Sequence, residues 1–364
     1  MIKITKATRL FIGLFLLIGL NKSQAQDTTK PLRITGYADV YYVYNFNKPL
    51  NNNQPSFLYC YNRNNEVNLN LGFVKASYTA SNLRANFALM SGTYAVANLA
   101  AEPTALRNIF EANIGIKLSA KNNLWLDAGI MPSHIGFESA IGKDCNNLTR
   151  SILAENTPYY EAGLKLSYTS KNEKWFLSAL LLNGWQRIKR LDGNTSPAFG
   201  TQITYKPSST VTLNSSSFIG NDKPDSSRQW RYFHNFYGSF QLSKKIALIT
   251  GFDIGAEQKS TGSSVMNTWY SPVLIAKYMA SNKFSIAARA EYYCDKKGVI
   301  ISTGTTNGFR TFGYSANFDY AIQENAVWRI ELRTLKSKDN IFEKRNSSFT
   351  STTTWLATSL AISF

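Results

Sequence analysis

The stretch EANIGIKLS, residues 111–119, decides the fold. Its even-numbered positions are apolar, and its odd-numbered positions are charged, polar or glycine. Because successive side chains of a β-strand point to opposite faces, this period of two predicts a strand with one apolar and one water-facing side. The alternation recurs elsewhere, with apolar faces at Val67, Leu69, Leu71 and Phe73, at Tyr160, Ala162, Leu164 and Leu166, and at Trp328, Ile330 and Leu332.

The expected strands are joined by short and long connectors that alternate along the chain. The short connectors lie at 81–82, 121–123, 170–174, 207–209, 243–245, 281–283 and 323–325. The long connectors lie at 47–65, 94–108, 135–157, 187–198, 221–230, 257–267, 295–308 and 337–349. A β-sandwich has no reason to sort its connectors by length, whereas an outer-membrane barrel has short periplasmic turns and long external loops.

We therefore predict an all-β chain that forms a transmembrane antiparallel β-barrel of about sixteen strands. The strands near 198–220 are the least regular in pattern, so fourteen or eighteen strands remain open. An even number closes an antiparallel barrel without a free edge, which a bilayer requires. A barrel of this size encloses an aqueous channel.

Composition agrees with this architecture. Charged residues make up 17% of the 364 residues and aromatic residues 13%, with 20 Tyr and 22 Phe. Soluble domains average about 25% charged residues. After the first 25 residues no run of about 20 apolar residues remains, so we expect no transmembrane helix.

The N-terminus has the pattern of a secretory signal peptide. Lys3, Lys6 and Arg9 precede an apolar run at 10–20, and residues 23–25 offer small side chains for cleavage. We expect residues 1–25 to be removed and residues 26–364 to form a single barrel domain in the cell outer membrane. The apolar run is too short for a spanning helix.

Four stretches resemble the OmpL-like β-barrel porins of Gram-negative bacteria. They are GYADVYY at 36–42, GIMPSHIGFE at 129–138, AENTPYYEAG at 154–163 and LNGWQRI at 182–188. The resemblance covers most of the chain after the signal peptide, most clearly 34–235. It implies an outer-membrane barrel and a diffusion channel, and it does not name a solute.

The predicted strand phases place nearly balanced charges on the lumen face. The positive residues are Arg33, Arg84, Lys117, Lys165, Arg289, Arg329 and Arg333. The negative residues are Asp39, Glu66, Glu111, Asp127, Glu161, Asp253, Glu291 and Glu331. The formal charge of +17 therefore does not predict an anion-selective pore. No nucleic-acid motif accompanies it, so we expect no nucleic-acid partner.

The connector at 135–157 is the longest and is a candidate constriction, because connectors longer than about 15 residues are usually functional or disordered. In general porins the third external loop folds inward and narrows the channel. By analogy, the constriction candidates are Glu138, Lys143, Asp144, Arg150 and Glu155. Opposed charges there would favour small polar solutes, and an outward flexible cap is the alternative.

The function that these patterns favour is passive diffusion of small hydrophilic solutes. Inward aromatic residues at Tyr37, Tyr41, Trp125, Tyr159 and Tyr293 leave a carbohydrate-selective channel open as an alternative. A surface adhesin or receptor would need larger loops. A barrel hydrolase is disfavoured, because the only histidines are His134 and His234 and no G-x-S-x-G elbow occurs.

The remaining expectations concern partners and covalent chemistry. The terminal Phe364 ends an alternating strand and resembles the signal that the barrel-assembly machinery recognises. Outer-membrane lipid is the other expected partner, and a homo-oligomer is compatible with the sequence. No cofactor or metal is expected. Cys60, Cys145 and Cys294 permit one disulfide, although unpaired thiols are preferred.

Overall fold

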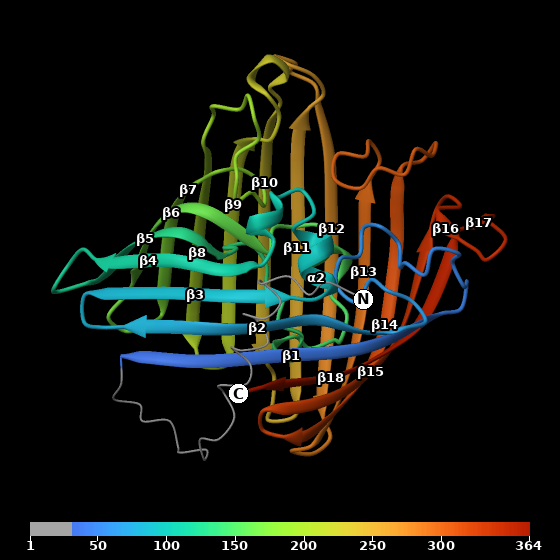
Figure 1. Cartoon of the computed structure of the whole chain (residues 1–364), viewed down its shortest axis with the longest axis horizontal. Helices are drawn as coiled ribbons and strands as arrows, with labels where there is room; N and C mark the ends of the chain where they lie inside the picture. Colours follow the sequence, from blue (N-terminus) through green and yellow to red (C-terminus); the bar gives the residue numbers. More distant parts are fainter. Residues whose placement is uncertain (1–30) are drawn as a thin grey trace, which may run out of the picture.

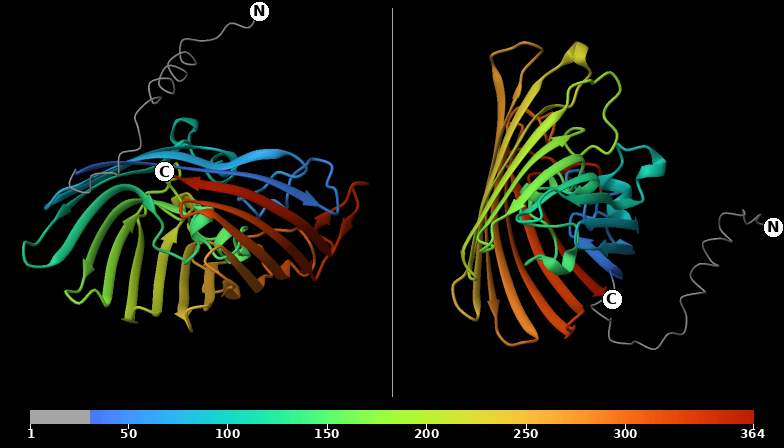
Figure 2. Two further views of the ribbon diagram at one scale, coloured as in Figure 1. Left: turned by 90° about the horizontal axis from the view of Figure 1, so that it is seen from below. Right: turned by 90° about the vertical axis from the view of Figure 1, so that its left-hand side faces the viewer.

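A computed structural model describes residues 31–364, so the predicted signal peptide lies outside the described residues. Within this range sixteen antiparallel strands form one closed barrel (Figures 1 and 2). The strands are β1 (Leu32–Asn45), β2 (Val67–Thr79), β3 (Leu83–Ser91), β4 (Ile109–Lys117), β5 (Asn123–Pro132), β6 (Tyr160–Thr169), β7 (Trp175–Leu182), β8 (Ala198–Ser208), β9 (Val211–Asn221), β10 (Trp230–Gln241), β11 (Ile246–Gln258), β12 (Met266–Met279), β13 (Phe284–Asp295), β14 (Phe309–Gln323), β15 (Ala326–Ser337) and β18 (Thr352–Ser363). The predicted barrel and its strand number are confirmed.

The other elements lie in the long connectors. They are α2 (Thr93–Asn98), η1 (Thr104–Leu106), η2 (Gly142–Asp144), α3 (Ile152–Glu155), η3 (Asp225–Ser227) and the hairpin of β16 (Phe342–Glu343) and β17 (Phe349–Thr350). Long and short connectors alternate around the barrel as the sequence predicts. No helix in residues 31–364 is long and apolar enough to span a membrane.

The barrel closes where β1 pairs with β18. The backbone amide of Gly36 donates to the carbonyl of Phe364 at 2.7 Å, and the amide of Phe364 donates back at 3.0 Å. The ladder continues from there to Asn45 and Trp355. Because both strands are paired on both sides, no sheet edge is left to water or lipid.

The alternation of EANIGIKLS appears directly in the burial of β4. Ile114 and Ile116 are exposed on the outer face, whereas Glu111 and Asn113 are buried inside the barrel. Glu111 receives hydrogen bonds from Lys75 and from the Nδ2 atom of Asn113. One strand thus presents an apolar side outward and a polar side to the lumen.

The predicted phase of β2 is wrong beyond its middle. A β-bulge lies where Asp39 pairs with Leu71 while Val40 pairs with Leu69, which leaves Asn70 as the extra residue. A one-residue shift exchanges the two faces of a strand. Leu71 is therefore fully buried, and Phe73 stacks on Phe110 inside the barrel instead of facing lipid.

Gly129 and Gly163, which pair across β5 and β6, lie where two neighbouring carbonyls approach closely. A Cβ atom on Gly129 would lie 2.2 Å from the carbonyl oxygen of Ala112, and its φ of 127° already favours glycine. A Cβ atom on Gly163 would lie 2.0 Å from the carbonyl oxygen of Leu181. Both glycines occur in the stretches that carry the family resemblance.

Gly129→Ala is expected to destabilise the barrel more than Gly262→Ala does. Both positions have positive φ, which costs about 1–2 kcal/mol for a residue with a side chain, but Gly262 has open space around it. The collision with the Ala112 carbonyl adds strain only at Gly129. Urea unfolding of the two refolded variants, followed by heat-modifiable gel mobility, measures the difference. Equal midpoints would contradict the role of the close approach.

Candidate functional site

The third long connector, residues 133–159, lies inside the barrel and is bound to the wall formed by β12–β15 (Figure 2). The carboxylate of Glu331 accepts hydrogen bonds from the amide of Thr149 at 2.6 Å and from its hydroxyl at 2.7 Å. Arg289 donates to the carbonyl of Thr149 at 2.6 Å and to Glu331 at 2.9 Å. A charged pair of the wall thus binds one residue of the connector from both sides.

Two further arginines repeat this arrangement along β15. Arg329 donates to the carbonyl oxygens of Gly142 at 2.6 Å and Cys145 at 2.9 Å, and it pairs with Asp319 at 2.7 Å. Arg333 donates to the carbonyl oxygen of Arg150 at 2.7 Å.

The carboxylate of Glu291 completes the group. It pairs with Arg333 at 2.6 Å and accepts the amide of Ile152 at 2.6 Å. We call Arg289, Glu291, Asp319, Arg329, Glu331 and Arg333 the wall charge cluster. Its three positive and three negative groups are all buried, and hydrogen bonds to the connector satisfy further donors of all three guanidinium groups, although the Nε atoms of Arg289 and Arg333 make no hydrogen bond.

Apolar contacts complete the attachment of the connector. Leu153 is fully buried against Val273 and Ile275 of β12, with Phe137 packed beside them. The amide of Leu148 donates to Asn317 of β14 at 2.9 Å. The connector therefore covers the inner face of four neighbouring strands, so this side of the lumen is filled.

The structure buries three of the five predicted constriction residues, Glu138, Arg150 and Glu155, and leaves Lys143 and Asp144 partly exposed. Arg150 is fully buried and donates to the carbonyls of Ser139, Leu148 and Ala140, all within the connector. Glu138 accepts hydrogen bonds from the amide and hydroxyl of Ser151.

Glu155 joins the third connector to the first, and only Lys143 and Asp144 are left partly exposed. The Glu155 carboxylate accepts the amides of Tyr59 at 2.8 Å and Cys60 at 3.2 Å. Burial raises the pKa of Glu155 to about 7. The side chains of Lys143 and Asp144 retain 27% and 54% exposure and pair with each other at 3.4 Å.

The start of the connector is bound to the opposite half of the barrel through His134. Its Nδ1 atom lies 2.8 Å from Glu161 of β6, and its Nε2 atom lies 2.8 Å from the carbonyl oxygen of Ser217 of β9. Because both neighbours are acceptors, both ring nitrogens donate and the imidazole is cationic. Burial opposes this charge, but the Glu161 carboxylate outweighs burial and the pKa of His134 is raised. His134 is thus held by two acceptors, neither of which is a serine hydroxyl.

The wall of β2–β7 carries charge pairs that are not bonded to the connector. Arg84 forms an ion pair with Asp127 at 2.5 Å and lies over the ring of Trp125 at 4.4 Å. Lys75 pairs with Glu111. In residues 31–364, Lys165 makes no hydrogen bond or ion pair, although it lies opposite Asp127 in the β5–β6 ladder.

Three cavities follow this wall, and the first lies between the wall and residues 135–141 of the third connector. The first, of about 250 Å³, is lined by Lys75, Glu111 and Pro132 among others, and the second, of about 280 Å³, shares Glu111 and Pro132 with it. The third, of about 440 Å³, shares Thr169 and Phe176 with the second and reaches the short turn between β6 and β7. We call this series the wall groove.

The remaining predicted lumen residues are dispersed. Arg33 is exposed near the start of β1, and Glu66 pairs with Arg63 at 2.6 Å beside the first long connector. Asp39 is fully buried and accepts the hydroxyl of Tyr61 at 2.5 Å. Asp253 is bound by Asn235 at 2.5 Å, and Lys117 is half-buried at the end of β4.

Of the aromatic candidates, four are buried within the core, and Trp125 and Tyr159 line the wall groove. The buried ones are Tyr37, Tyr41, Tyr159 and Tyr293. The three cysteines are free thiols, with Cys60 and Cys145 buried. His234 lies on the outer face between the exposed Tyr232 and Phe236, as its phase predicts.

Two contributors to the site were missed in the sequence. Lys75 was assigned no role, because the bulge at Asn70 reverses the phase that the first half of β2 establishes. Asp319 was overlooked although it alternates with Asn317 on the inner face of β14, and this alternation would have identified it.

A family model described as "Putative beta-barrel porin-2, OmpL-like" matches residues 31–364, the whole described range. The chain belongs to this porin family. The family is the one that the four sequence stretches indicate, and the prediction of an outer-membrane β-barrel porin is confirmed.

Solved porins share the fold at low sequence identity. An anion-selective porin from Comamonas acidovorans superposes with a TM-score of 0.59 at 9% identity, covering 92% of this chain and 99% of that chain. OmpT of Vibrio cholerae superposes with a TM-score of 0.59 at 7% identity, covering 92% of this chain and 97% of that chain. The in-vitro folded trimer form of OmpT superposes with a TM-score of 0.58 at 9% identity, covering 92% of this chain and 99% of that chain. No curated protein matches the sequence.

Glu331→Gln is expected to release the third connector from the wall. The substitution keeps the size of the side chain but leaves Arg289 buried without one of its carboxylate partners, which costs about 3 kcal/mol in comparable buried pairs. Lys143 and Arg150 make the connector cleavable by trypsin once it is released. Limited proteolysis should cut the variant faster than the wild type, and Glu66→Gln serves as the control. Equal cleavage rates would contradict this attachment.

The contact between the first and third connectors is expected to weaken as pH rises. The pKa of Glu155 in the folded protein, about 7, lies above the ordinary value of about 4.3. The folded state therefore binds the proton more tightly, and stability falls between about pH 4 and pH 7, by on the order of 3 kcal/mol. Protection factors of the Tyr59 and Cys60 amides should be lower at pH 8 than at pH 5. Glu155→Gln should remove this difference, and its persistence in that variant would refute the assignment.

Proposed function

We propose that this protein is a passive channel for small hydrophilic solutes and that the wall groove is the route of permeation. The observation that supports this route is the series of three cavities along β2–β8, in which neighbouring cavities share lining residues, opposite the wall of β12–β15. Membership of a porin family and the closed sixteen-stranded barrel support a channel. The first cavity is lined mainly by apolar and aromatic side chains, whereas amides, hydroxyls and charged groups predominate in the second and third, which suits hydrated polar solutes there.

The charges of the groove favour polar over apolar solutes without strong ion preference. The ion pairs Arg84–Asp127 and Lys75–Glu111 offer both signs along the same wall. Lys165 is the exception, since no neighbouring group pairs with it in the described chain. We infer that Lys165 gives the groove its net preference for anions. The relative from Comamonas acidovorans is described as anion-selective, which agrees with this inference.

The third connector has two roles in this proposal. Glu138, Arg150 and Glu155 maintain the conformation of the connector and its contact with the first connector. They therefore affect permeation by positioning the connector. Lys143 and Asp144 are the members of the predicted constriction set that offer charge to solutes. The connector narrows the lumen by filling the side next to the wall charge cluster.

A homo-oligomer in the outer membrane is the proposed assembly. The outer face of β8–β10 carries two polar contacts, Thr201 to Ser217 at 2.6 Å and Ser215 to His234 at 2.9 Å. Polar groups on a lipid-facing surface are costly, and contact with a second subunit would remove them from lipid. OmpT of Vibrio cholerae, described in a trimer form, supports this proposal. We also propose that a signal peptide at residues 1–25 directs export and that the barrel-assembly machinery recognises Phe364.

Single-channel recording in a planar bilayer tests the route. The mature chain should give stepwise conductance, and deletion of 139–149 should raise it because the deleted segment fills part of the lumen. A folded, heat-modifiable barrel that never conducts would contradict a channel. Unchanged conductance after the deletion would contradict the narrowing role of the connector.

Lys165→Glu is expected to shift the reversal potential under a salt gradient toward cation selectivity. The substitution replaces the unpaired positive charge of the groove by a negative one beside Asp127. Lys245→Glu, on the exposed turn between β10 and β11, changes the total charge equally and serves as the control. The same shift in both variants would show that net charge, and not the groove, sets selectivity.

A further inference from the structure

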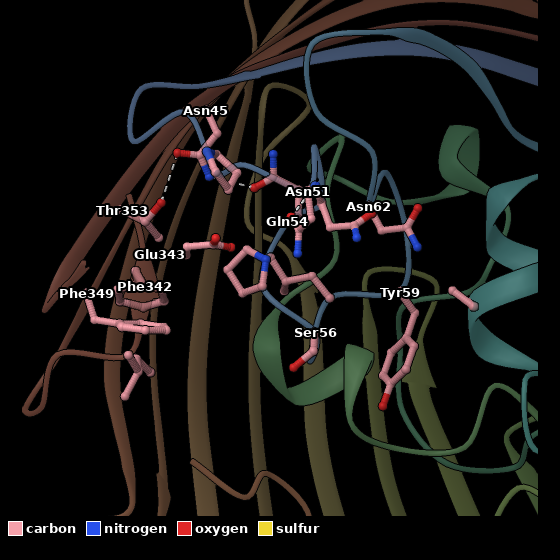
Figure 3. Close-up of a pocket in the computed structure, with 16 residues that line it drawn as sticks. Asn45, Asn51, Gln54, Ser56, Tyr59, Asn62, Phe342, Glu343, Phe349 and Thr353 are labelled. Atoms are coloured by element: carbon pink, nitrogen blue, oxygen red, sulfur yellow. Dashed lines mark hydrogen bonds between the residues drawn. The ribbon is translucent and has the colours of Figure 1, made fainter. Parts of the chain in front are cut away.

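The cavity of about 450 Å³ shown in Figure 3 lies outside the wall groove. It is formed by the first long connector, residues 46–66, together with the hairpin of β16 and β17 in the last long connector, so it lies at the long-loop rim. Its size falls within the range of about 300–1,000 Å³ that small-molecule sites occupy. None of its lining residues is used in the proposed route.

Gln54 carries a buried donor that has no partner. Its Oε1 atom accepts a hydrogen bond from Asn45 at 3.0 Å, and Asn45 in turn accepts one from Thr353 at 3.2 Å. The Nε2 atom of Gln54 makes no hydrogen bond, although the side chain is only 5% exposed and lines the cavity. An unsatisfied buried amide is costly, so a missing acceptor is expected beside it.

Asn62 supplies the complementary group on the same side of the cavity. Its Oδ1 atom is buried without a hydrogen-bond donor. Figure 3 shows Asn51, Gln54 and Asn62 along one side and Phe342, Glu343 and Phe349 along the other. One side of the cavity therefore contains an unpaired donor and an unpaired acceptor, each buried in the present side-chain conformation, so a ligand reaches them once the two amides rotate.

The opposite side combines an aromatic face with one carboxylate. Glu343 and Phe349 are cross-strand partners in the β16–β17 hairpin, so their side chains lie on the same face of it. Phe349 is 58% exposed, which leaves its ring open to a ligand. No lysine or arginine lines the cavity, and an anionic ligand would therefore meet only the Glu343 charge.

We propose that this cavity binds the ring of a neutral saccharide. Sugar hydroxyls both donate and accept, so they can satisfy the Gln54 amide and the Asn62 carbonyl together. The Glu343 carboxylate can accept from two adjacent hydroxyls, and the apolar C–H face of the ring can pack on Phe349. A surface site of this kind would hold saccharide at the long-loop rim whether or not the barrel conducts.

Two sources of this chemistry have to be separated. The saccharide is either a free sugar in solution or the glycan part of a lipid in the same membrane. Both present neutral hydroxylated rings and would use the same residues. A free sugar binds from solution, whereas a lipid-linked glycan requires its own oligosaccharide.

The test is calorimetric titration of the full refolded barrel, in a detergent without a sugar headgroup, with maltose, glucose, N-acetylglucosamine and a neutral O-antigen oligosaccharide released from lipopolysaccharide. Gln54→Glu keeps the acceptor for Asn45 and removes the free donor, and Phe349→Ala removes the aromatic face. Each should weaken binding about three- to tenfold. Val265→Ala changes an equally exposed apolar residue in another long loop and is the control, expected to leave affinity unchanged.

Saturable binding of a free sugar that both variants weaken supports the site and assigns a solute. Binding of the O-antigen oligosaccharide alone, weakened in the same way, supports the site and assigns the membrane glycan. Absence of binding by all four probes overturns the proposal, as does binding that neither variant changes. Heat-modifiable gel mobility confirms that each variant is folded. Since no conductance is measured, a negative result leaves the proposed channel function intact.

Discussion

Three buried arginines of one wall depend on the backbone of the third connector. Arg289, Arg329 and Arg333 form ion pairs within the wall charge cluster, but a guanidinium has five donors and the carboxylates do not satisfy them all. Carbonyl oxygens of the connector accept hydrogen bonds from further donors of all three arginines. A buried charge without partners is costly, so the connector and the wall stabilise each other. The inward fold of residues 133–159 follows from this requirement.

This attachment makes the two halves of the lumen different. On the side of β12–β15 the charged side chains form hydrogen bonds with the connector. Leu153 of the connector packs against Val273 and Ile275 of this wall. On the side of β2–β8 the ion pairs are local, neighbouring cavities share lining residues, and the ammonium of Lys165 forms no ion pair within the described residues. The nearly balanced lumen charges therefore have two different roles. The wall charge cluster binds the third connector, and the remaining charges line the groove that we propose for solutes.

The sequence predicted the architecture well because two independent signals agree. Alternation identified strands such as β4, and connector length assigned their direction, which together led to sixteen strands. The phase prediction failed at Leu71 and Phe73, since a bulge adds one residue without a mark in the hydrophobic pattern. For the constriction, the sequence identified the correct loop, but the role of Arg150 depends on how the loop folds on itself and that of Glu155 on a contact with the first connector, and spacing reveals neither.

Thiol accessibility across the two walls tests the central claim most directly. In a chain with Cys60, Cys145 and Cys294 replaced by serine, single cysteines are placed at Thr169, which lines the wall groove, and at Ser315, which lies under the connector and accepts from Asn147 at 3.3 Å. A charged methanethiosulfonate reagent should modify Thr169→Cys rapidly and reduce the single-channel current, while Ser315→Cys stays unmodified. Rapid modification of Ser315→Cys with no effect at Thr169→Cys would contradict the account.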